Sequence, residues 1–436
     1  MKNPRQIAAA ALLEAESRAA WSNISLDSAL RRRELSPADT AFVATLFYGV
    51  IERRLTLDAC IRAHSNQRLE KLSAKVLCAL RLGVYQLLYT DIPDHAALSE
   101  SVEIARALKV PYAAGFVNGV LRAFLRSGKE VPLPGEPLAA RLSIEFSCPQ
   151  PLVDILLASA GEKSARAFLA DSLGRPPISV RVNTQRTDAS ALIKLLADEG
   201  VQASPHSQLP DCLMLESTGA VAALRSFQLG LFHVQDVSSQ LCVSALGPQP
   251  GMRVLDACAA PGGKTFTAAQ LMGGRGEIVA CDLHEQRVGL ITKRAEQMGL
   301  AGITAIRRDM SVHHEDLGFF DRVLCDMPCS GYGVIRRKPE IKYKPLSEFE
   351  KISILQYNIL EKSAQYCKEG GVLIYSTCTF NPQENEQVVG RFLERHPQFT
   401  PRPLGGLLGE HSSRTLLGDF GGDGFFLAGL QKVGSA

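Results

Sequence analysis

Apolar residues recur three and four positions apart through the first quarter of the chain, and no strand pattern interrupts them. The stretches with this spacing are residues 41–61, 76–89, 98–108 and 115–125. Such spacing predicts amphipathic helices. The apolar run 7–13 is followed at once by Glu14, Glu16 and Arg18, which favours a first amphipathic helix over a signal peptide. Ser36 followed by Pro37 is typical of a helix start. These residues predict a helical bundle.

The pattern changes after residues 128–137, which contain three prolines and two glycines and are typical of a linker. Residues 141–235 then mix helical spacing with short strand-like runs at 178–183 and 212–215. We therefore expect a helical domain at 1–140, a small α+β subdomain at 141–235, and a third domain at 236–432.

From residue 252 onward, predicted strands and helices alternate. The strands are expected at 253–257, 277–281, 304–307, 322–326 and 371–375, and the helices at 264–272, 284–298, 346–368 and 383–395. A late strand at 425–430 could close the edge of the sheet. This alternation is typical of an α/β fold with a doubly wound, parallel, Rossmann-like sheet.

Composition narrows the classes of function only slightly. The formal net charge is +3, and the first 140 residues hold 18 Lys and Arg against 14 Asp and Glu, so any nucleic-acid surface must be local. The eleven cysteines are odd in number and form no C-x-x-C pair, which argues against a disulfide framework and a zinc ribbon and favours the reducing cytoplasm. No uncharged apolar run reaches the roughly 18 residues of a membrane span.

A glycine turn follows the first predicted strand of the third domain. The turn ends in Gly263-Lys264-Thr265, but the first glycine of a P-loop would fall at Cys258, and G-x-G-x-x-G also fails. The turn still allows its backbone to approach a ligand closely, with helix amides beyond it. A nucleotide-like cofactor is therefore expected at the carboxyl ends of the strands.

Carboxylates end the next three predicted strands. Asp282 is placed to accept hydrogen bonds from ribose hydroxyls, Asp309 to meet an adenine amino group, and Asp326 ends the fourth strand. One such carboxylate is usually a turn or cap residue. Three in succession after a glycine turn favour ligand contacts.

Two cysteines follow the last two predicted parallel strands: Cys329 comes after 322–326 and Cys378 after 371–375. Both should face one crevice at the carboxyl ends of the strands. A thiol there is either a small buried apolar group or a nucleophile. A cysteine nucleophile beside a nucleotide-like cofactor suggests covalent chemistry on a base. The chemistry does not say which thiol attacks.

The chain resembles bacterial RNA cytosine-5 methyltransferases of the RsmB/Sun (Fmu) family. The matching motifs are residues 258–265, 326–331 and 376–379, with 381–386 following, and the N-terminal segments 47–50, 99–105 and 116–122 resemble the NusB-type RNA-binding fold. Met327 replaces the small residue more usual in the family's Asp-Ala-Pro-Cys motif.

The resemblance implies methyl transfer from S-adenosylmethionine to carbon 5 of a cytidine in small-subunit (16S) ribosomal RNA through a covalent cysteine adduct. It implies that Cys378 is the nucleophile, that Cys329 promotes product release, and that Asp326 contacts cytosine and cofactor. The cofactor-binding residues it implies are Cys258, Ala259, Ala260, Pro261, Gly262, Gly263, Lys264, Asp282, Asp309 and Asp326.

Two rival functions stay open. In DNA cytosine methylation Cys329 would attack, and in a non-enzymatic RNA-binding assembly or antitermination factor the cofactor fold would be vestigial.

The basic segment 336–344, with five cations and one tyrosine, is either a phosphate track or a solvated loop. We expect a cytoplasmic monomer without metal or membrane partner.

Overall fold

The computed structural model describes residues 3–18, 22–31, 35–216 and 218–434. The chain forms two compact units. The first comprises Met1–Gly174 together with Ile335–Lys344, and the second comprises Arg175–Val334 together with Pro345–Ala436. The late segment Ile335–Lys344 thus belongs to the unit built by the N-terminal residues. The three-domain division at residues 140 and 235 stays a prediction.

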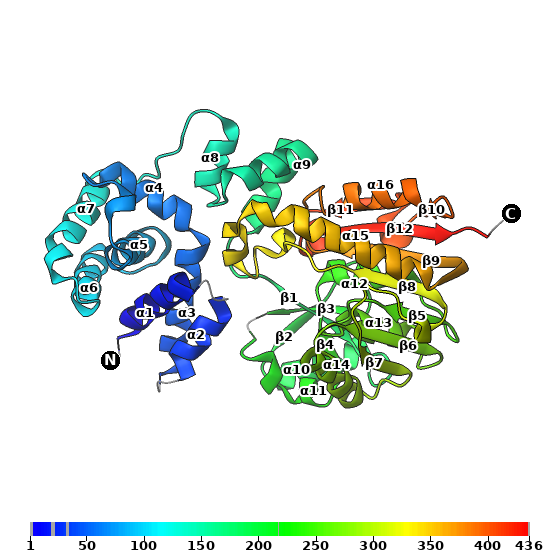
Figure 1. The fold of residues 1–436 in the computed structure, drawn as a ribbon. Coiled ribbons are helices and arrows are strands. Elements are labelled where there is room, and N and C mark those ends of the chain that lie inside the picture. Colours follow the sequence, from blue (N-terminus) through cyan, green and yellow to red (C-terminus); the bar gives the residue numbers. More distant parts are fainter. Residues whose placement is uncertain (1–2, 19–21, 32–34, 217, 435–436) are drawn as a thin grey trace. The chain divides into compact units, whose positions relative to one another are not determined.

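The first unit is helical, as its sequence pattern predicts. Its helices are α1 (Pro4–Arg18), α2 (Ser22–Arg31), α3 (Pro37–Glu52), α4 (Arg54–His64), α5 (Ala74–Tyr89), α6 (Asp94–Ala107), α7 (Ala114–Arg126), α8 (Leu138–Glu145) and α9 (Gln150–Asp171) (Figure 1). The apolar faces of α1 to α7 share one core around Phe47, Leu82 and Phe124, all fully buried.

The helix boundaries follow local chemistry. Ser36 caps α3 by accepting a hydrogen bond from the Asp39 amide at 3.1 Å, with Pro37 in the first helical position. The expected helical stretch 41–61 is two helices, because Arg53 leaves helical geometry between α3 and α4. Gly161, at φ 73°, breaks α9 into two segments.

A small antiparallel sheet opens the second unit, with strand order β2-β3-β1-β4. Its strands are β1 (Ile178–Val182), β2 (Gln202–Pro205), β3 (Cys212–Glu216) and β4 (Phe232–Val234), accompanied by α10 (Ala189–Asp198) and α11 (Arg225–Gln228). Val180, Leu192 and Phe232 are fully buried between sheet and helices. This part of the unit is the α+β subdomain that the strand-like runs predict.

The main sheet of the second unit has the order β10-β12-β9-β8-β5-β6-β7, with β11 paired to β12. The strands are β5 (Arg253–Asp256), β6 (Glu277–Asp282), β7 (Ile303–Arg307), β8 (Phe320–Asp326), β9 (Cys367–Thr377), β10 (Phe399–Pro401), β11 (Ser413–Leu416) and β12 (Phe425–Lys432). Strands β5 to β9 pair in parallel, as predicted. The late strand β12 lies inside the sheet rather than at its edge, because β10 and β11 pair on its outer side.

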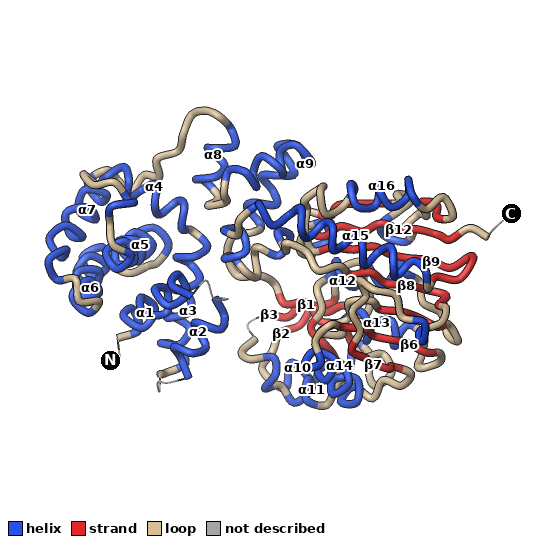
Figure 2. The backbone as a smooth tube through the Cα atoms, viewed as in Figure 1, coloured by secondary structure: helices blue, strands red, loops and turns tan. Residues whose placement is uncertain are grey.

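Helices cover both faces of this sheet (Figures 1 and 2). One face packs against α12 (Val237–Leu246), α13 (Gly263–Leu271) and α14 (Glu285–Met298), and the other against α15 (Phe349–Gln365) and α16 (Glu386–Arg395). Neighbouring strand residues alternate between the layers: Val254 and Leu324 enter the first core, Leu255 and Val323 the second. Burial on both faces explains the apolar runs at residues 254–255, 278–281 and 323–325 in the central strands.

The strand order reverses around β5, which pairs with β6 on one side and with β8 on the other. Ligands of open α/β sheets bind at such a switch point, outside the carboxyl ends of the strands. The residues after β5, β8 and β9 are those that carry the predicted chemistry. No helix within the described ranges is long and apolar enough to cross a bilayer.

Candidate active site

The glycine turn after β5 builds one wall of a pocket of about 190 Å³. Gly262 has φ 104°, and an added Cβ would lie 2.4 Å from the Phe266 ring, so a side chain is excluded here. The pocket is lined by Val234, Gln235, Asp236, Ser239, Asp256, Cys258, Ala259, Ala260, Pro261, Gly263, Lys264 and Asp326. Seven predicted residues therefore meet at one site: Cys258, Ala259, Ala260, Pro261, Gly263, Lys264 and Asp326.

Three predicted cofactor residues, Gly262, Asp282 and Asp309, do not line this pocket. Gly262 allows the turn to form through its positive φ, and its missing side chain leaves room for the Phe266 ring. Asp282 is buried at the end of β6 and accepts a hydrogen bond from the His284 amide at 3.0 Å. The exposed Asp309 accepts hydrogen bonds from the Ser311 hydroxyl and amide, which lower the pKa of its carboxyl. Their ribose and adenine contacts stay predictions.

An ion pair holds Asp326 at the mouth of this pocket. The Lys264 Nζ atom donates to Asp326 Oδ2 at 2.5 Å, and the Ser376 hydroxyl donates to Oδ1 at 2.8 Å. Burial alone would lower the pKa of Lys264, but the carboxylate raises it above its ordinary value. Lys264 is therefore a charged ammonium, and Asp326 is held by donors from α13 and β9.

Two lining residues that the sequence interpretation missed carry unsatisfied polar atoms. Asp256, at the end of β5, accepts a hydrogen bond from the Thr265 hydroxyl at 2.7 Å through Oδ2, while Oδ1 has no partner among the described residues. Burial raises the pKa of Asp256 to about 7. Gln235 uses Oε1 to accept from the Thr267 hydroxyl, and its Nε2 atom is also without a partner in the described part of the chain.

These orphaned atoms point to a polar ligand, because buried polar groups are normally hydrogen-bonded. The position of Asp256 at the end of the first strand is the signal by which the sequence could have identified it. Gln235 follows the strand β4, which has only three residues and is too short to show the alternation by which a strand is predicted.

The loops after β8 and β9 bring the two predicted cysteines together. The Sγ atoms of Cys329 and Cys378 lie 3.1 Å apart. With Cys258 they are the three cysteines of the eleven that are partly exposed. The hydrogen bond to Cys378, followed by burial, raises the pKa of the Cys329 thiol well above its ordinary value. Cys329 is therefore a protonated thiol, and either sulfur can donate in this contact.

The motif at residues 381–386 fixes both loops. The buried Glu384 carboxylate accepts hydrogen bonds from the Ser330 amide at 2.8 Å and from Asn381 Nδ2 at 3.1 Å. Asn385 accepts from the Thr377 hydroxyl at 2.6 Å and donates to the Thr379 carbonyl at 3.0 Å. Glu384 thus holds the Cys329 loop and Asn385 the Cys378 loop, which makes them positioning residues.

Gly333 joins the same loops through its backbone. Its amide donates to the Cys378 carbonyl at 2.9 Å, and its carbonyl accepts from the Gly424 amide at 2.9 Å. A Cβ at residue 333 would lie 1.9 Å from the Gly424 carbonyl oxygen. Backbone cannot move aside as a flexible side chain can, so these segments must separate if residue 333 has a side chain.

Gly333→Ala is therefore expected to lower the methyl transfer that the family resemblance implies by about 100-fold, because an ångström of displacement at a reacting group has that effect. The measurement is the initial rate of methyl incorporation beside a thermal melt. Gly289→Ala is the matched control, because a Cβ there meets no atom within 4 Å. This helical control should keep full activity and melt slightly higher. Equal activity of both variants would contradict the positioning role of Gly333.

Lys342 and Tyr343 of the basic segment 336–344 fit neither of the two alternatives considered for it, and both alternatives stay open for its other cations. In the first unit, Lys342 is buried and donates through Nζ to the Glu52 carbonyl at 2.7 Å, and Tyr343 donates to the Ile51 carbonyl at 3.0 Å. Burial lowers the pKa of Lys342 to about 8. The Arg54 guanidinium lies 3.6 Å from the Tyr343 ring centroid. These side chains pack into a protein interior and do not track phosphates.

No group of three or more His, Cys, Asp or Glu side chains within the described residues is arranged to hold a metal ion.

Three family models match the chain. One described as 16S rRNA methyltransferase RsmB/F matches residues 243–431, one of the NusB family matches 2–126, and one of an RsmF/B-like ferredoxin-like domain matches 148–222. The chain is 36% identical over 446 aligned residues to the probable ribosomal RNA small subunit methyltransferase B of Bacillus subtilis (strain 168), with 99% of both chains covered. It is 36% identical to the ribosomal RNA small subunit methyltransferase B of Citrobacter koseri, with 92% of both covered.

Solved structures agree with this fold. The crystal structure of PH0851 superposes with a TM-score of 0.80 at 25% identity, covering 98% of this chain and 99% of that one. A methyltransferase homologue from Pyrococcus horikoshii gives a TM-score of 0.58 at 27% identity, covering 68% of this chain and all of that one.

A doubly wound sheet with a glycine turn and a carboxylate-lined pocket at its switch point defines a Rossmann-like class I methyltransferase, here with a NusB-like helical domain and a small α+β insert. The chain belongs to the family of the ribosomal RNA small subunit methyltransferases B. It is a methyltransferase.

Proposed function

We propose that this enzyme transfers a methyl group from S-adenosylmethionine to carbon 5 of a cytidine in small-subunit ribosomal RNA, through a covalent bond between Cys378 and carbon 6. The observation that carries the proposal is the 3.1 Å approach of the Cys329 and Cys378 sulfurs beside a pocket that ends at Asp326. The names of the relatives support the RNA substrate. The cytoplasmic location and the monomeric state stay predictions.

The pocket suits the methionine end of S-adenosylmethionine, which supplies an electrophilic methyl group when bound. That end carries an ammonium, a sulfonium and a carboxylate. Asp256 Oδ1 and Gln235 Nε2 are an acceptor and a donor without partners within the described ranges. Lys264 and Asp326 add one charge of each sign. These four side chains would hold the cofactor, and the cis peptide before Pro261 lies in the turn beside them.

The titration of Asp256 makes cofactor affinity depend on pH. Its pKa is raised to about 7, so the carboxyl is protonated below this pH and becomes a carboxylate above it. A carboxylate attracts the cationic ligand, so affinity for S-adenosylmethionine should increase through pH 7, by about tenfold from pH 6 to pH 8. Isothermal titration at pH 6, 7 and 8 measures this change.

Asp256→Asn removes the titrating group, so the ratio of wild-type to variant affinity should grow with pH and approach its minimum at pH 6. Asp316→Asn is the control, because Asp316 is an exposed carboxylate outside the pocket. An affinity ratio for Asp256→Asn that does not change with pH would contradict the assignment.

The raised pKa of Cys329 supports the roles proposed for the two thiols. A Cys329 thiol that keeps its proton is a donor 3.1 Å from the Cys378 sulfur, where it would stabilise negative charge during attack. A thiolate is the form that adds to carbon 6. After the methyl group reaches carbon 5, a water positioned by the Cys329 thiol accepts the carbon 5 proton. The electron pair of that C–H bond restores the ring double bond, and the bond between carbon 6 and sulfur breaks to release Cys378 as a thiolate.

Asp326 is proposed to pass a proton, supplied by Lys264, to the cytosine ring nitrogen on which negative charge develops. The Lys264 ammonium lies 2.5 Å from this carboxylate and brings both a positive charge and a proton. Preorganised charges of this kind stabilise a transition state without reorganisation. The base itself must be unpaired to reach the site, because stacking in a duplex hides carbon 6.

The test is incubation of the purified protein with methyl-labelled S-adenosylmethionine and unmodified small-subunit ribosomal RNA, followed by digestion to nucleosides. Label in 5-methylcytidine supports the proposal. Label in another nucleoside, or none despite cofactor binding, would contradict it.

A further inference from the structure

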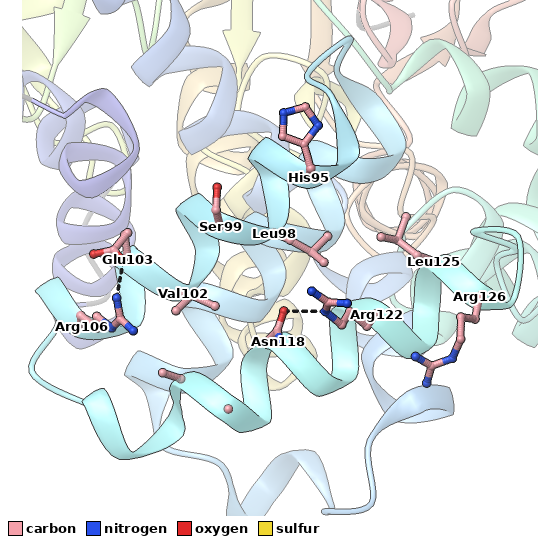
Figure 3. A pocket seen from close by; sticks show the side chains of 12 residues that line it. His95, Leu98, Ser99, Val102, Glu103, Arg106, Asn118, Arg122, Leu125 and Arg126 are labelled. Atoms are coloured by element: carbon pink, nitrogen blue, oxygen red, sulfur yellow. Dashed lines mark hydrogen bonds and ion pairs between the residues drawn. The ribbon is translucent and has the colours of Figure 1, made fainter.

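A groove of about 760 Å³ lies between α6 and α7 in the first unit, within the size range of pockets that enclose whole small-molecule ligands (Figure 3). Each helix contributes the face turned away from its core: Val117, Val120, Leu121 and Phe124 of α7 are buried, whereas Asn118, Arg122 and Arg126 face the groove. None of these residues belongs to the site described above.

The groove has an apolar floor and a cationic rim. Leu98, Val102 and Leu125 contribute the apolar part. The charged residues are Arg106, Arg122 and Arg126 against Glu103, which leaves an excess of two positive charges. Arginine binds phosphate through a planar fork of donors, so this rim is suited to an anionic, phosphate-bearing partner.

The three arginines differ in what they already bind. Arg106 pairs with Glu103 at 2.5 Å, and Arg122 donates to Asn118 Oδ1 at 3.2 Å; both contacts are drawn in Figure 3. Arg126 has no hydrogen-bond or ion-pair partner among the residues that the structure describes. It lies one helical turn from Arg122, about 6 Å between Cβ atoms, so the two guanidiniums can engage successive anionic groups.

Two features favour nucleic acid over a protein partner at this surface. Tyr112, in the turn that joins α6 to α7, is 78% exposed, and an exposed aromatic ring is a stacking platform for a base. Gly115 is the second residue of α7 and lines the groove, and a Cβ there would meet no atom within 4 Å. No neighbouring group requires a glycine here, whereas its missing side chain lets a ligand backbone come close.

We propose that this groove, defined by Arg106, Arg122, Arg126 and the adjacent Tyr112, binds an unpaired stretch of the substrate RNA away from the methylated base. Arginines would hold the phosphates while the apolar floor and the tyrosine meet base faces. A duplex could not use the floor, because its bases are already stacked and paired. The inference rests on the proposed RNA substrate and deepens it: the groove contributes RNA affinity and takes no part in the chemical step.

The test compares Arg122→Glu/Arg126→Glu with Arg62→Glu/Arg68→Glu, an equal change of charge on exposed arginines of the same unit outside the groove. The groove variant should raise KM for ribosomal RNA at least tenfold, with kcat and S-adenosylmethionine affinity unchanged. Its salt slope, log KM against log salt, should fall by about two, one for each lost phosphate contact. A merely structural effect would not change that slope.

Direct binding is measured by the anisotropy of a fluorescein-labelled ten-nucleotide single-stranded RNA, with a hairpin duplex as competitor. The single strand should bind more tightly than the hairpin, and both the groove variant and Tyr112→Ala should weaken it at least fivefold. Gly115→Leu fills the groove without altering charge and should have the same effect. It keeps the test decisive if the charge-reversed variant does not fold.

The two proposals fail in different ways. If the wild type methylates ribosomal RNA and the groove variants keep its KM and salt slope, the groove inference is overturned and the proposed function stands. If the wild type does not methylate this RNA, the proposed function fails, and the anisotropy assay still decides whether the groove binds RNA. Variants that bind RNA normally but act poorly on ribosomal subunits would overturn the inference in favour of a protein partner.

Discussion

Replacing Cys378 with alanine is expected to reduce methyl transfer to ribosomal RNA by roughly 10⁴-fold or more, the loss typical when a catalytic nucleophile is removed. The methyl group cannot pass to carbon 5 until a thiolate has added to carbon 6, and alanine offers no substitute. Cofactor affinity should remain as in the wild type, because Cys378 does not line the cofactor pocket. The measurements are label incorporated into 5-methylcytidine and a parallel cofactor titration.

The matched control for this variant is Cys367→Ala. Cys367 begins the strand β9, immediately after which Cys378 lies, and it is buried at the opposite end of that strand. Its loss removes one buried sulfur from the core and should cost stability rather than activity. Wild-type rates in Cys378→Ala would exclude this residue as the nucleophile.

Replacing Cys329 with alanine is expected to have a different signature: a covalent complex between enzyme and RNA that survives denaturation. If Cys329 promotes loss of the carbon 5 proton, methylation proceeds once and the product stays attached to Cys378. Steady-state turnover should then fall by about 10²- to 10⁴-fold, the usual contribution of one acid or base, while one methyl group per enzyme is still transferred. A denaturing gel with end-labelled RNA, beside a single-turnover assay, measures both.

The double variant Cys329→Ala/Cys378→Ala is the control, because it removes the attacking sulfur and should form no complex. The opposite pattern, in which Cys378→Ala traps the RNA and Cys329→Ala is inert, would assign the attack to Cys329, as in DNA cytosine methylation. Absence of a complex from every variant, with turnover intact, would contradict covalent catalysis altogether.

The fold was largely predictable because both of its patterns are strong. Strands β5 to β8 are apolar on both faces, and their predicted ends lie within a few residues of those observed. The start of β9 was missed because Lys368, Glu369 and Gly370 are exposed and show no apolar strand pattern, so that the expected helix was extended to residue 368. Strands β2 and β4 are too short for an alternation to appear. The break at Arg53 leaves no mark on the helical spacing.

The candidate site was predictable where the chemistry stands at a strand end, and less so elsewhere. Strand-end position identified Asp326, Cys329 and Cys378. The structure brings the loops that carry them together: the two sulfurs are in contact, and Ser376 donates to Asp326. It does not reveal how Glu384 and Asn385 act, because their partners lie in two other loops. Local charge misled us at Lys342: a run of cations predicts solvent, whereas tertiary packing buries this one against a carbonyl.

The packing of Lys342, which is buried, and Tyr343, which is half-buried, against the N-terminal helix α3 limits how this protein can be divided. The segment Ile335–Lys344 is encoded between the two cysteine motifs, yet its hydrogen-bond acceptors are carbonyls of Ile51 and Glu52. A gene cut after codon 174 would yield a catalytic fragment carrying an orphaned lysine and tyrosine, and a helical fragment without the segment that hydrogen-bonds to the end of α3. If the helical unit is transferred to another methyltransferase, residues 335–344 must be transferred with it. Because these ten residues are encoded inside the catalytic part, the helical and catalytic parts cannot be exchanged independently.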